Sequence, residues 1–152
     1  MSGRLFDTPL GLMLANEENA RLTGLDFVDG GDFVAAHDTT LLLLETERQI
    51  GAYFRGELSR FDIPLNLRGT PFQKAVWARL MAIPYGKTAT YGRIALDAGW
   101  PRAARAAGGA IHRNPVSIIV PCHRVIGASG SLTGYGGGLH RKKALLELES
   151  RP

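Results

Sequence analysis

The spacing of hydrophobic and polar positions changes several times along this chain, and each change predicts a different element. In the first 70 residues, the apolar stretches Leu10–Leu14 and Leu22–Phe27 flank the polar cluster Asn16–Asn19, which is typical of a β-hairpin. After a break at Asp29–Asp32, a segment from about Thr39 to Leu58 predicts a helix. One face of that helix carries Leu43, Ile50, Tyr53 and Phe54.

The second half of the chain opens with the signals of helix starts. Thr70 supplies an N-cap and Pro71 stands at the first helical position, so the sequence predicts a helix over about 72–82. A second short helix is expected over 91–98, with Thr90 as its cap.

A third helix is expected to open at Pro101 and to stop at Asn114–Pro115, and it consists almost wholly of small residues. Its two interior glycines each cost about 1 kcal/mol relative to alanine, so we expect another surface to approach it closely. That surface is either another element of the protein or an external partner. Arg102 and Arg105 lie three residues apart on one face, which suits phosphates better than an apolar core.

Taken together, these elements predict an α/β (α+β) fold with two domains. A small sheet-and-helix domain is expected over 1–68, and the passage 61–68, which holds Asp62 and Pro64, is the natural connection. The domain expected over 69–152 has three short helices joined by tight turns. This arrangement is typical of a helix-turn-helix or winged-helix-like domain, whose last helix meets DNA.

The charges of the two halves have opposite signs. Residues 1–70 carry 6 basic and 11 acidic side chains, a net −5, whereas residues 71–152 carry 12 and 3, a net +9. A basic half of this kind attracts polyanions, and nucleic acid is the leading partner. The alternative is a solvated basic face that serves solubility.

The composition limits the other classes of function. The leucine run 41–44 is far too short to cross a bilayer, so we expect no membrane partner and a cytoplasmic location. The single cysteine, Cys122, cannot form an internal disulfide, and no cluster of Cys and His supports a structural zinc site. We therefore expect a free, reduced thiol and no metal.

The candidate chemistry lies where the apolar run Val116–Val120 meets Pro121-Cys122-His123-Arg124. The run predicts a buried strand with the thiol at its end, where nearby cations lower the pKa of the thiol toward the nucleophilic thiolate. The alternative is that Cys122 is only a small buried hydrophobe. Because neighbours on an extended chain point to opposite sides, His123 would act on the thiol through a bridging water.

A relay of this kind needs a carboxylate to hold the imidazole. Glu147 and Glu149 are the only glutamates of the basic half, and either one could instead be a surface helix residue. Asn114 is equally open to two interpretations, as a turn former before Pro115 or as a member of the site.

These residues resemble the O6-alkylguanine-DNA alkyltransferases, also called methylated-DNA–protein-cysteine methyltransferases. The resemblance covers 72–149 nearly without gaps, and the Pro-Cys-His-Arg-Val sequence at 121–125 is its signature. It also includes Phe72-Gln73, Val76-Trp77, Ile83–Gly86, Tyr91-Gly92, Ala103–Ala107, Asn114-Pro115 and Gly134–Gly138.

The resemblance implies an irreversible transfer of an alkyl group to Cys122 from O6-alkylguanine in double-stranded DNA, with no cofactor and no obligate protein partner. It implies that His123 activates Cys122 through a water, that Glu149 orients His123 and that Asn114 braces the turn. Tyr91 would donate a proton to the guanine. The pocket would be lined by Pro121, Val125, Tyr135 and Gly136.

The resemblance further implies that the alkylated nucleotide is flipped out of the duplex and that Arg105 fills the gap. The third helix would enter the minor groove, where short side chains are an advantage. The DNA contacts would come from Arg102, Ala104, Arg105, Gly108, Thr90 and Tyr91.

The chain departs from the family pattern at Gly136, where many members have serine, and this leaves the breadth of substrates open. Residues 1–70 match the family only in outline, and with His37 as their sole Cys or His they cannot supply the zinc site of some members. Two kinds of non-catalytic protein are alternatives: an alkyltransferase-like lesion sensor, in which the acceptor cysteine is replaced, and a winged-helix regulator. A cysteine hydrolase would need a separate oxyanion site.

Overall fold

The computed structural model describes residues 1–29 and 36–151, which fold into two compact units. Unit 1 comprises Met1–Leu67 and Pro115–Ser117, and unit 2 comprises Arg68–Asn114 and Ile118–Pro152. The segment Pro115–Ser117 belongs to unit 1 because Val116 forms a β-bridge with Leu25. Of the predicted break at Asp29–Asp32, residues 30–32 lie outside the described part of the chain.

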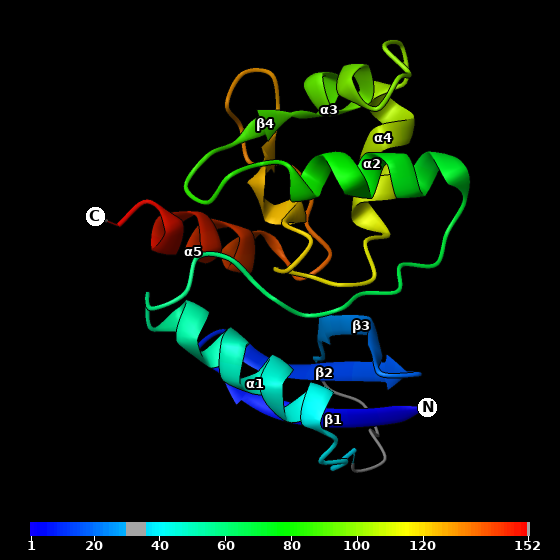
Figure 1. The fold of residues 1–152 in the computed structure, drawn as a ribbon. Helices are drawn as coiled ribbons and strands as arrows, with labels where there is room; N and C mark the ends of the chain where they lie inside the picture. The colour runs from blue at the N-terminus through cyan, green and yellow to red at the C-terminus, as the bar shows by residue number, and fades with distance from the viewer. Residues whose placement is uncertain (30–35, 152) are drawn as a thin grey trace. The chain divides into compact units, whose positions relative to one another are not determined.

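A three-stranded antiparallel sheet in the order β1–β2–β3 forms the centre of unit 1 (Figure 1). Its strands are β1 Ser2–Thr8, β2 Gly11–Glu18 and β3 Arg21–Phe27. The predicted hairpin corresponds to β2 and β3, whereas β1 is a strand that the hydrophobic pattern does not predict. The turn lies at Asn19 and Ala20, whose φ angles are 53° and 59°, so only the last residue of the predicted turn cluster is in it, and residues 16–18 continue β2. Two left-handed residues suit the twist of a tight hairpin.

Helix α1 Leu41–Phe54 packs on this sheet (Figure 1). The predicted face is confirmed for Leu43, Ile50 and Tyr53, which are fully buried, whereas Phe54 is only half-buried. The predicted end at Leu58 is wrong. Gly56 has a φ of 75°, and its backbone N–H donates to Tyr53 O at 3.0 Å. The backbone N–H of Glu57 donates to Ala52 O at 2.9 Å. This pair of bonds closes the helix as a Schellman motif.

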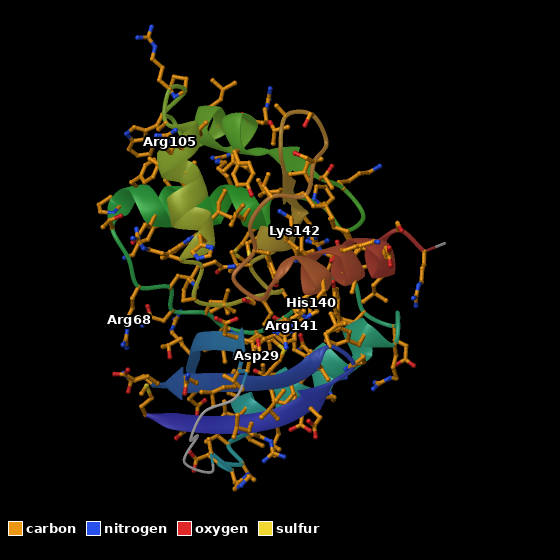
Figure 2. The ribbon with its side chains drawn as sticks, turned by 180° about the vertical axis from the view of Figure 1, so that it is seen from behind. Asp29, Arg68, Arg105, His140, Arg141 and Lys142 are labelled. Carbon is orange, nitrogen blue, oxygen red and sulfur yellow. The ribbon has the colours of Figure 1, made fainter. Side chains whose placement is uncertain are left out.

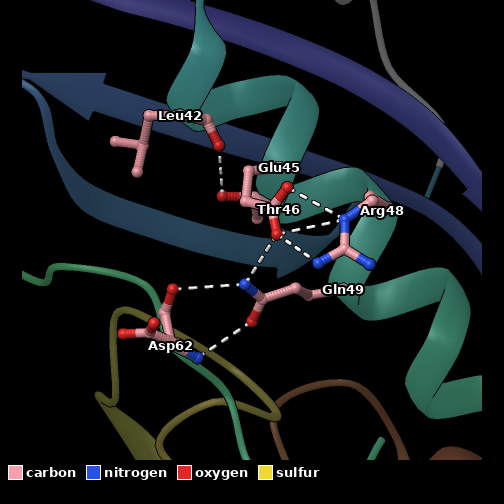
Figure 3. Close-up of polar contacts among 6 residues, drawn as sticks. All are labelled: Leu42, Glu45, Thr46, Arg48, Gln49 and Asp62. Atoms are coloured by element: carbon pink, nitrogen blue, oxygen red, sulfur yellow. Dashed lines mark hydrogen bonds and ion pairs between the residues drawn. The ribbon is translucent and has the colours of Figure 1, made fainter. Parts of the chain in front are cut away.

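The start of the connecting passage is held to α1 by the side chain of Gln49 (Figure 3). Gln49 Oε1 accepts from Asp62 N at 2.9 Å, and Gln49 Nε2 donates to Asp62 O at 3.2 Å. The same amide nitrogen donates to Glu45 Oε1 at 2.9 Å, so a side chain that is only 4% exposed has all of these groups paired. Because a buried polar group is costly when unpaired, this cluster holds the start of the passage on α1.

Unit 2 starts with the two helices whose caps the sequence predicts. In α2 Pro71–Met81, the Thr70 side chain accepts from Gln73 N at 3.1 Å and Gln73 Oε1 accepts from Thr70 N at 3.0 Å. This reciprocal pair is a capping box. In α3 Tyr91–Asp97, the Thr90 side chain accepts from Arg93 N at 3.2 Å. Both predicted helices are confirmed.

Helix α4 Ala104–His112 begins later than predicted. Pro101 does not open it, because a hydrogen-bonded turn from Ala103 N to Trp100 O at 3.0 Å occupies the residues around that proline. The helix is anchored to α2 by the buried Trp77, whose indole Nε1 donates to Ala110 O at 2.8 Å. One side of α4 is therefore fixed against α2.

The predicted strand Val116–Val120 is wrong. Val116 makes only an isolated bridge, and Ile118 turns the chain with a φ of 71°, an unusual value for a β-branched residue. The chain then forms the short 3-10 helix η1 Cys122–Arg124 and the strand β5 Val125–Ile126, which pairs in parallel with β4 Ala89–Thr90. The last helix, α5 Leu139–Glu149, follows the glycine-rich loop 134–138.

Candidate active site

The single thiol lies on the first residue of η1 and follows a tight turn. Cys122 N donates to Val120 O at 2.8 Å, and Pro121 between them has φ −81° and ψ 65°. These values define an inverse γ-turn, to which the fixed φ of proline is well suited. Cys122 is 7% exposed, so its surroundings within the protein set its reactivity.

Asn114 braces this turn from the end of α4. Its side-chain Nδ2 donates to Val120 O at 2.7 Å, the same carbonyl that accepts from Cys122 N. Between Asn114 and Val120, the chain passes through the left-handed Ile118. Such a backbone costs on the order of 1–3 kcal/mol and persists only where its surroundings hold it. The hydrogen bond places the Asn114 side chain on the turn before Cys122, and its role in the site stays a prediction.

His123 is fully buried and meets Glu149 of α5. The imidazole Nε2 lies 2.7 Å from Glu149 Oε2, and Glu149 is itself only 4% exposed. An ionised carboxylate can only accept hydrogen bonds, so Nε2 carries the proton of the neutral ring. Glu147 is exposed, and the structure therefore brings Glu149 rather than Glu147 to His123.

The other ring nitrogen of His123 is suited to act as a base. Among the described residues, His123 Nδ1 has no hydrogen-bond partner although it is buried. The pKa of His123 lies below its ordinary value of 6.5, chiefly because burial disfavours the charged ring, an effect that the bond to Glu149 opposes. Since Nε2 holds the proton, Nδ1 of the neutral ring presents a lone pair.

Arg124 is part of this cluster, although its place in the signature predicted no separate role for it. Its Nε donates to Glu149 Oε1 at 2.7 Å, its Nη2 to Glu149 Oε2 at 3.1 Å and its Nη1 to Ile83 O at 2.6 Å. Tyr85 lies beside it, with 5.8 Å between the Arg124 Cζ and the ring centroid. Because arginine is usually exposed, nothing in the sequence signals this burial.

Lys142 is a second buried cation that the sequence did not reveal. Its Nζ donates to Thr133 O at 2.9 Å and lies 5.9 Å from the centroid of the Tyr91 ring. Burial lowers the pKa of Lys142, and the charge of Cys122 opposes that shift. The Lys142 ammonium and the Cys122 thiolate therefore favour each other's charged form.

Tyr91 at the start of α3 is positioned by Thr133. The Thr133 hydroxyl donates to Tyr91 OH at 2.7 Å, which leaves the phenolic proton available for another acceptor. The ring also contacts α4, because a Cβ added at Gly108 would lie 3.6 Å from one of its carbons. Thr133 is a further residue that sequence reasoning missed.

The expected pocket residues differ in exposure. Pro121, Val125 and Tyr135 are buried, whereas Gly136 is exposed. A Cβ added at Gly136 would lie 3.9 Å from His112 O, an ordinary contact, so a serine side chain would fit there. The absence of a side chain at Gly136 is therefore no requirement of the fold.

The expected DNA-binding residues lie mostly on the exposed side of α4 and the turn before it. Arg102, Ala104 and Arg105 are exposed, and Arg105 lies apart from Lys142 within unit 2 (Figure 2). A Cβ added at the exposed Gly109 would meet no atom within 4 Å. Packing within the described chain therefore does not explain that glycine. Thr90 serves as the N-cap of α3.

Within residues 1–29 and 36–151, no group of three or more His, Cys, Asp or Glu side chains is placed to hold a metal ion. No helix in the same ranges has the length and apolar character needed to cross a membrane.

Two family models match the chain. Residues 1–67 match the model described as 6-O-methylguanine DNA methyltransferase, ribonuclease-like domain, and residues 71–151 match the model described as 6-O-methylguanine DNA methyltransferase, DNA binding domain. The match therefore includes residues 1–67, which resemble the family only in outline at the level of motifs.

Individual relatives agree with the family models. The chain is 50% identical over 151 residues to the methylated-DNA–protein-cysteine methyltransferase of Mycolicibacterium paratuberculosis, covering 97% of this chain and 92% of the relative. It is 48% identical to that of Methanosarcina acetivorans, covering 95% and 96%. Among solved structures, Mycobacterium tuberculosis OGT in complex with DNA has a TM-score of 0.91 at 49% identity, covering 99% and 93%.

Proposed function

Since this chain belongs to the 6-O-methylguanine DNA methyltransferase family, which repairs O6-methylguanine in DNA by direct reversal, we propose that Cys122 accepts the alkyl group. The observation that carries this proposal is the buried pair formed by His123 and Glu149. It presents a neutral imidazole, with Nδ1 unpaired among the described residues, next in sequence to the only cysteine. An alkyltransferase-like lesion sensor replaces the acceptor cysteine, whereas this chain keeps Cys122, and a regulator would not require Cys-His beside a glycine loop.

The transfer begins when His123 Nδ1 takes the thiol proton, directly or through one water. The Lys142 ammonium favours the resulting thiolate. The sulfur then attacks the alkyl carbon, a carbon–sulfur bond forms, and the carbon–oxygen bond breaks with its electron pair left on guanine. Tyr91 offsets the developing charge by donating its phenolic proton to the base, helped by the bond from Thr133.

Each molecule reacts once, because a thioether has no group that water or a base readily displaces. The chemistry uses only side chains of the protein. It requires Cys122 to stay reduced, and this supports a cytoplasmic location, where thiols are kept reduced. Asn114 contributes by holding the carbonyl of Val120 and therefore the turn that presents the thiol. Pro121, Val125, Tyr135 and Gly136 would line the pocket for the guanine.

The direct test is to incubate the protein with excess duplex DNA that carries one O6-methylguanine. We expect intact-protein mass spectrometry to show a plateau at one added methyl group per molecule. Tryptic peptides should place that group on Cys122. Several turnovers per molecule, or a methyl group on any other residue, would contradict the proposal.

We also propose that the exposed side of α4 meets double-stranded DNA. The net charge of +9 over 71–152 supports contact with phosphates, and the small side chains at Ala104, Gly108 and Gly109 suit a narrow minor groove. Arg102 would reach the backbone. Because O6 is hidden inside the stack, the nucleotide must rotate out of the duplex, and Arg105 would take its place.

Arg105→Ala should slow repair of duplex DNA by about tenfold or more, because the arginine offsets unstacking that costs a few kcal/mol. The free base O6-benzylguanine needs no flipping and should react with the variant at nearly the wild-type rate. Single-turnover rates on both substrates measure the difference.

Arg55→Ala is the matched control for the Arg105 variant. It also removes one exposed arginine, but from the C-cap of α1 in unit 1. It should leave both rates unchanged. Equal losses on duplex and free base in Arg105→Ala would mean that the change damages the active site rather than the insertion step.

A further inference from the structure

The Glu149 carboxylate is shared by the side chains of His123 and Arg124, with a longer contact from Gly86 N to Oε1 at 3.5 Å, and the mechanism above uses only the bond to His123. Oε2 lies 2.7 Å from His123 Nε2 and also accepts from Arg124 Nη2 at 3.1 Å, while Oε1 accepts from Arg124 Nε at 2.7 Å. Arg124 therefore binds Glu149 in the bidentate manner, the strongest form of this pair. His123 shares a carboxylate whose charge is already largely balanced.

We propose that Arg124 sets the basicity of His123 by sharing the Glu149 carboxylate, and so acts as a positioning residue for alkyl transfer. The inference rests on the proposed role of His123 as the base for Cys122. It assigns to Arg124 an electrostatic task in addition to holding α5 against the carbonyl of Ile83.

The physical reason is the charge that His123 experiences. A lone carboxylate within hydrogen-bond distance strongly favours the imidazolium, whose Nδ1 already carries a proton and cannot take one from the thiol. The guanidinium of Arg124 offsets this effect, because its positive charge lies on the same carboxylate. Burial of the ring then acts in the same direction and keeps the imidazole neutral.

Other charged groups around His123 do not replace this effect. On α5, Glu149 favours the imidazolium and Lys142 disfavours it, and on η1 Arg124 disfavours it, with Cys122 as the neighbouring titratable thiol. The turn between α2 and α3 contributes Tyr85, which faces Arg124 and Glu149. Lys142 donates to Thr133 O instead of to Glu149, so Arg124 alone of these cations is bonded to the carboxylate.

The fork geometry explains why this position needs an arginine. Three guanidinium nitrogens of Arg124 serve two different acceptors, Glu149 and the carbonyl of Ile83. A lysine would supply the charge from one nitrogen and could not keep both contacts in the same way. Substitutions of Arg124 can therefore separate the effect of its charge from the effect of its hydrogen-bond geometry.

The experiment compares Arg124→Met and Arg124→Gln, which remove the charge, with Arg124→Lys, which keeps it. In the full chain carrying Cys122→Ser, NMR titration reports the pKa of His123. In the reactive protein, single-turnover transfer is measured across pH. The neutral variants should raise the His123 pKa by about one unit or more and move the acid limb of the rate profile upward by a similar amount. At a pH on that limb, one unit corresponds to about a tenfold slower transfer.

Arg124→Lys should keep the His123 pKa and the midpoint of the acid limb at their wild-type values while reacting more slowly at every pH. Arg141→Met is the matched control, since it removes another buried arginine of unit 2 that donates to Gly137 O and should leave the His123 midpoint in place. If Arg124→Met does not fold, Arg124→Gln carries the same test, because its amide can still donate to the carboxylate.

A uniform loss of rate in the neutral variants with an unchanged His123 pKa would overturn the proposal and leave Arg124 a purely structural role. The NMR titration does not depend on which residue accepts the alkyl group. Failure of the proposed function would instead appear in the mass-spectrometric test, as a methyl group on a residue other than Cys122.

Discussion

Cys122→Ser should abolish alkyl transfer while duplex binding stays at the wild-type level. Serine nearly preserves the shape of the buried side chain, but its hydroxyl is hardly ionised at neutral pH and is a far weaker nucleophile than a thiolate. The proposed DNA-binding residues lie on α4 and the turn before it, which the substitution does not alter. Transfer is measured with labelled O6-methylguanine DNA, and binding by fluorescence anisotropy on undamaged duplex.

His123→Ala serves as the comparison for the serine variant. It removes the base but keeps the acceptor, so it should react slowly and still end at one alkyl group per molecule. Residual transfer by Cys122→Ser that reaches the same end point would show that another residue accepts the alkyl group.

Glu149→Gln should slow transfer by about 10²–10⁴-fold and lower the free energy of unfolding by about 3–5 kcal/mol. The carboxylate oxygens accept from His123 and Arg124 together, whereas an amide has one acceptor oxygen and turns an NH₂ group toward the other donor. The Arg124 charge is then buried without its counter-ion. Denaturant unfolding gives the stability, and single-turnover kinetics give the rate.

Glu147→Gln is the matched control for this prediction, because Glu147 lies two residues earlier on α5 and is exposed. It should change neither the stability nor the rate by a measurable amount. If Glu149→Gln behaved like Glu147→Gln, the buried carboxylate would have no role in catalysis or folding. The final stoichiometry should be the same in all three proteins.

Local chemistry explains why some elements could be predicted from the sequence. Thr70 and Thr90 each satisfy backbone amides of the helix that follows, and this depends only on neighbours within a few residues. The buried face of α1 follows in the same way from helical periodicity. The positions of the glutamates alone restricted the carboxylate to Glu147 or Glu149, and only the family resemblance selected Glu149.

Other features depend on contacts that are distant in sequence. Val116–Val120 has the composition of a strand, yet Val116 makes an isolated bridge to Leu25 and Ile118 takes a left-handed conformation. Hydrophobic pattern alone cannot reveal such a turn. Arg124 and Lys142 are buried by partners that lie 25 and 9 residues away, and their side-chain types ordinarily indicate the surface.

The burial of His123 couples the stability of the fold to protons. The unfolded chain binds a proton on this imidazole with the ordinary pKa of 6.5, whereas in the folded chain the pKa is lower. The stability that the neutral ring contributes is complete above 6.5 and is lost as the pH falls through the folded pKa, because protons then favour the unfolded chain. The folded protein therefore loses stability as the pH falls below 6.5, and His123 is protonated and no longer acts as a base once the pH falls below its folded pKa. A decline of repair in acid combines titration of the site with loss of folded protein.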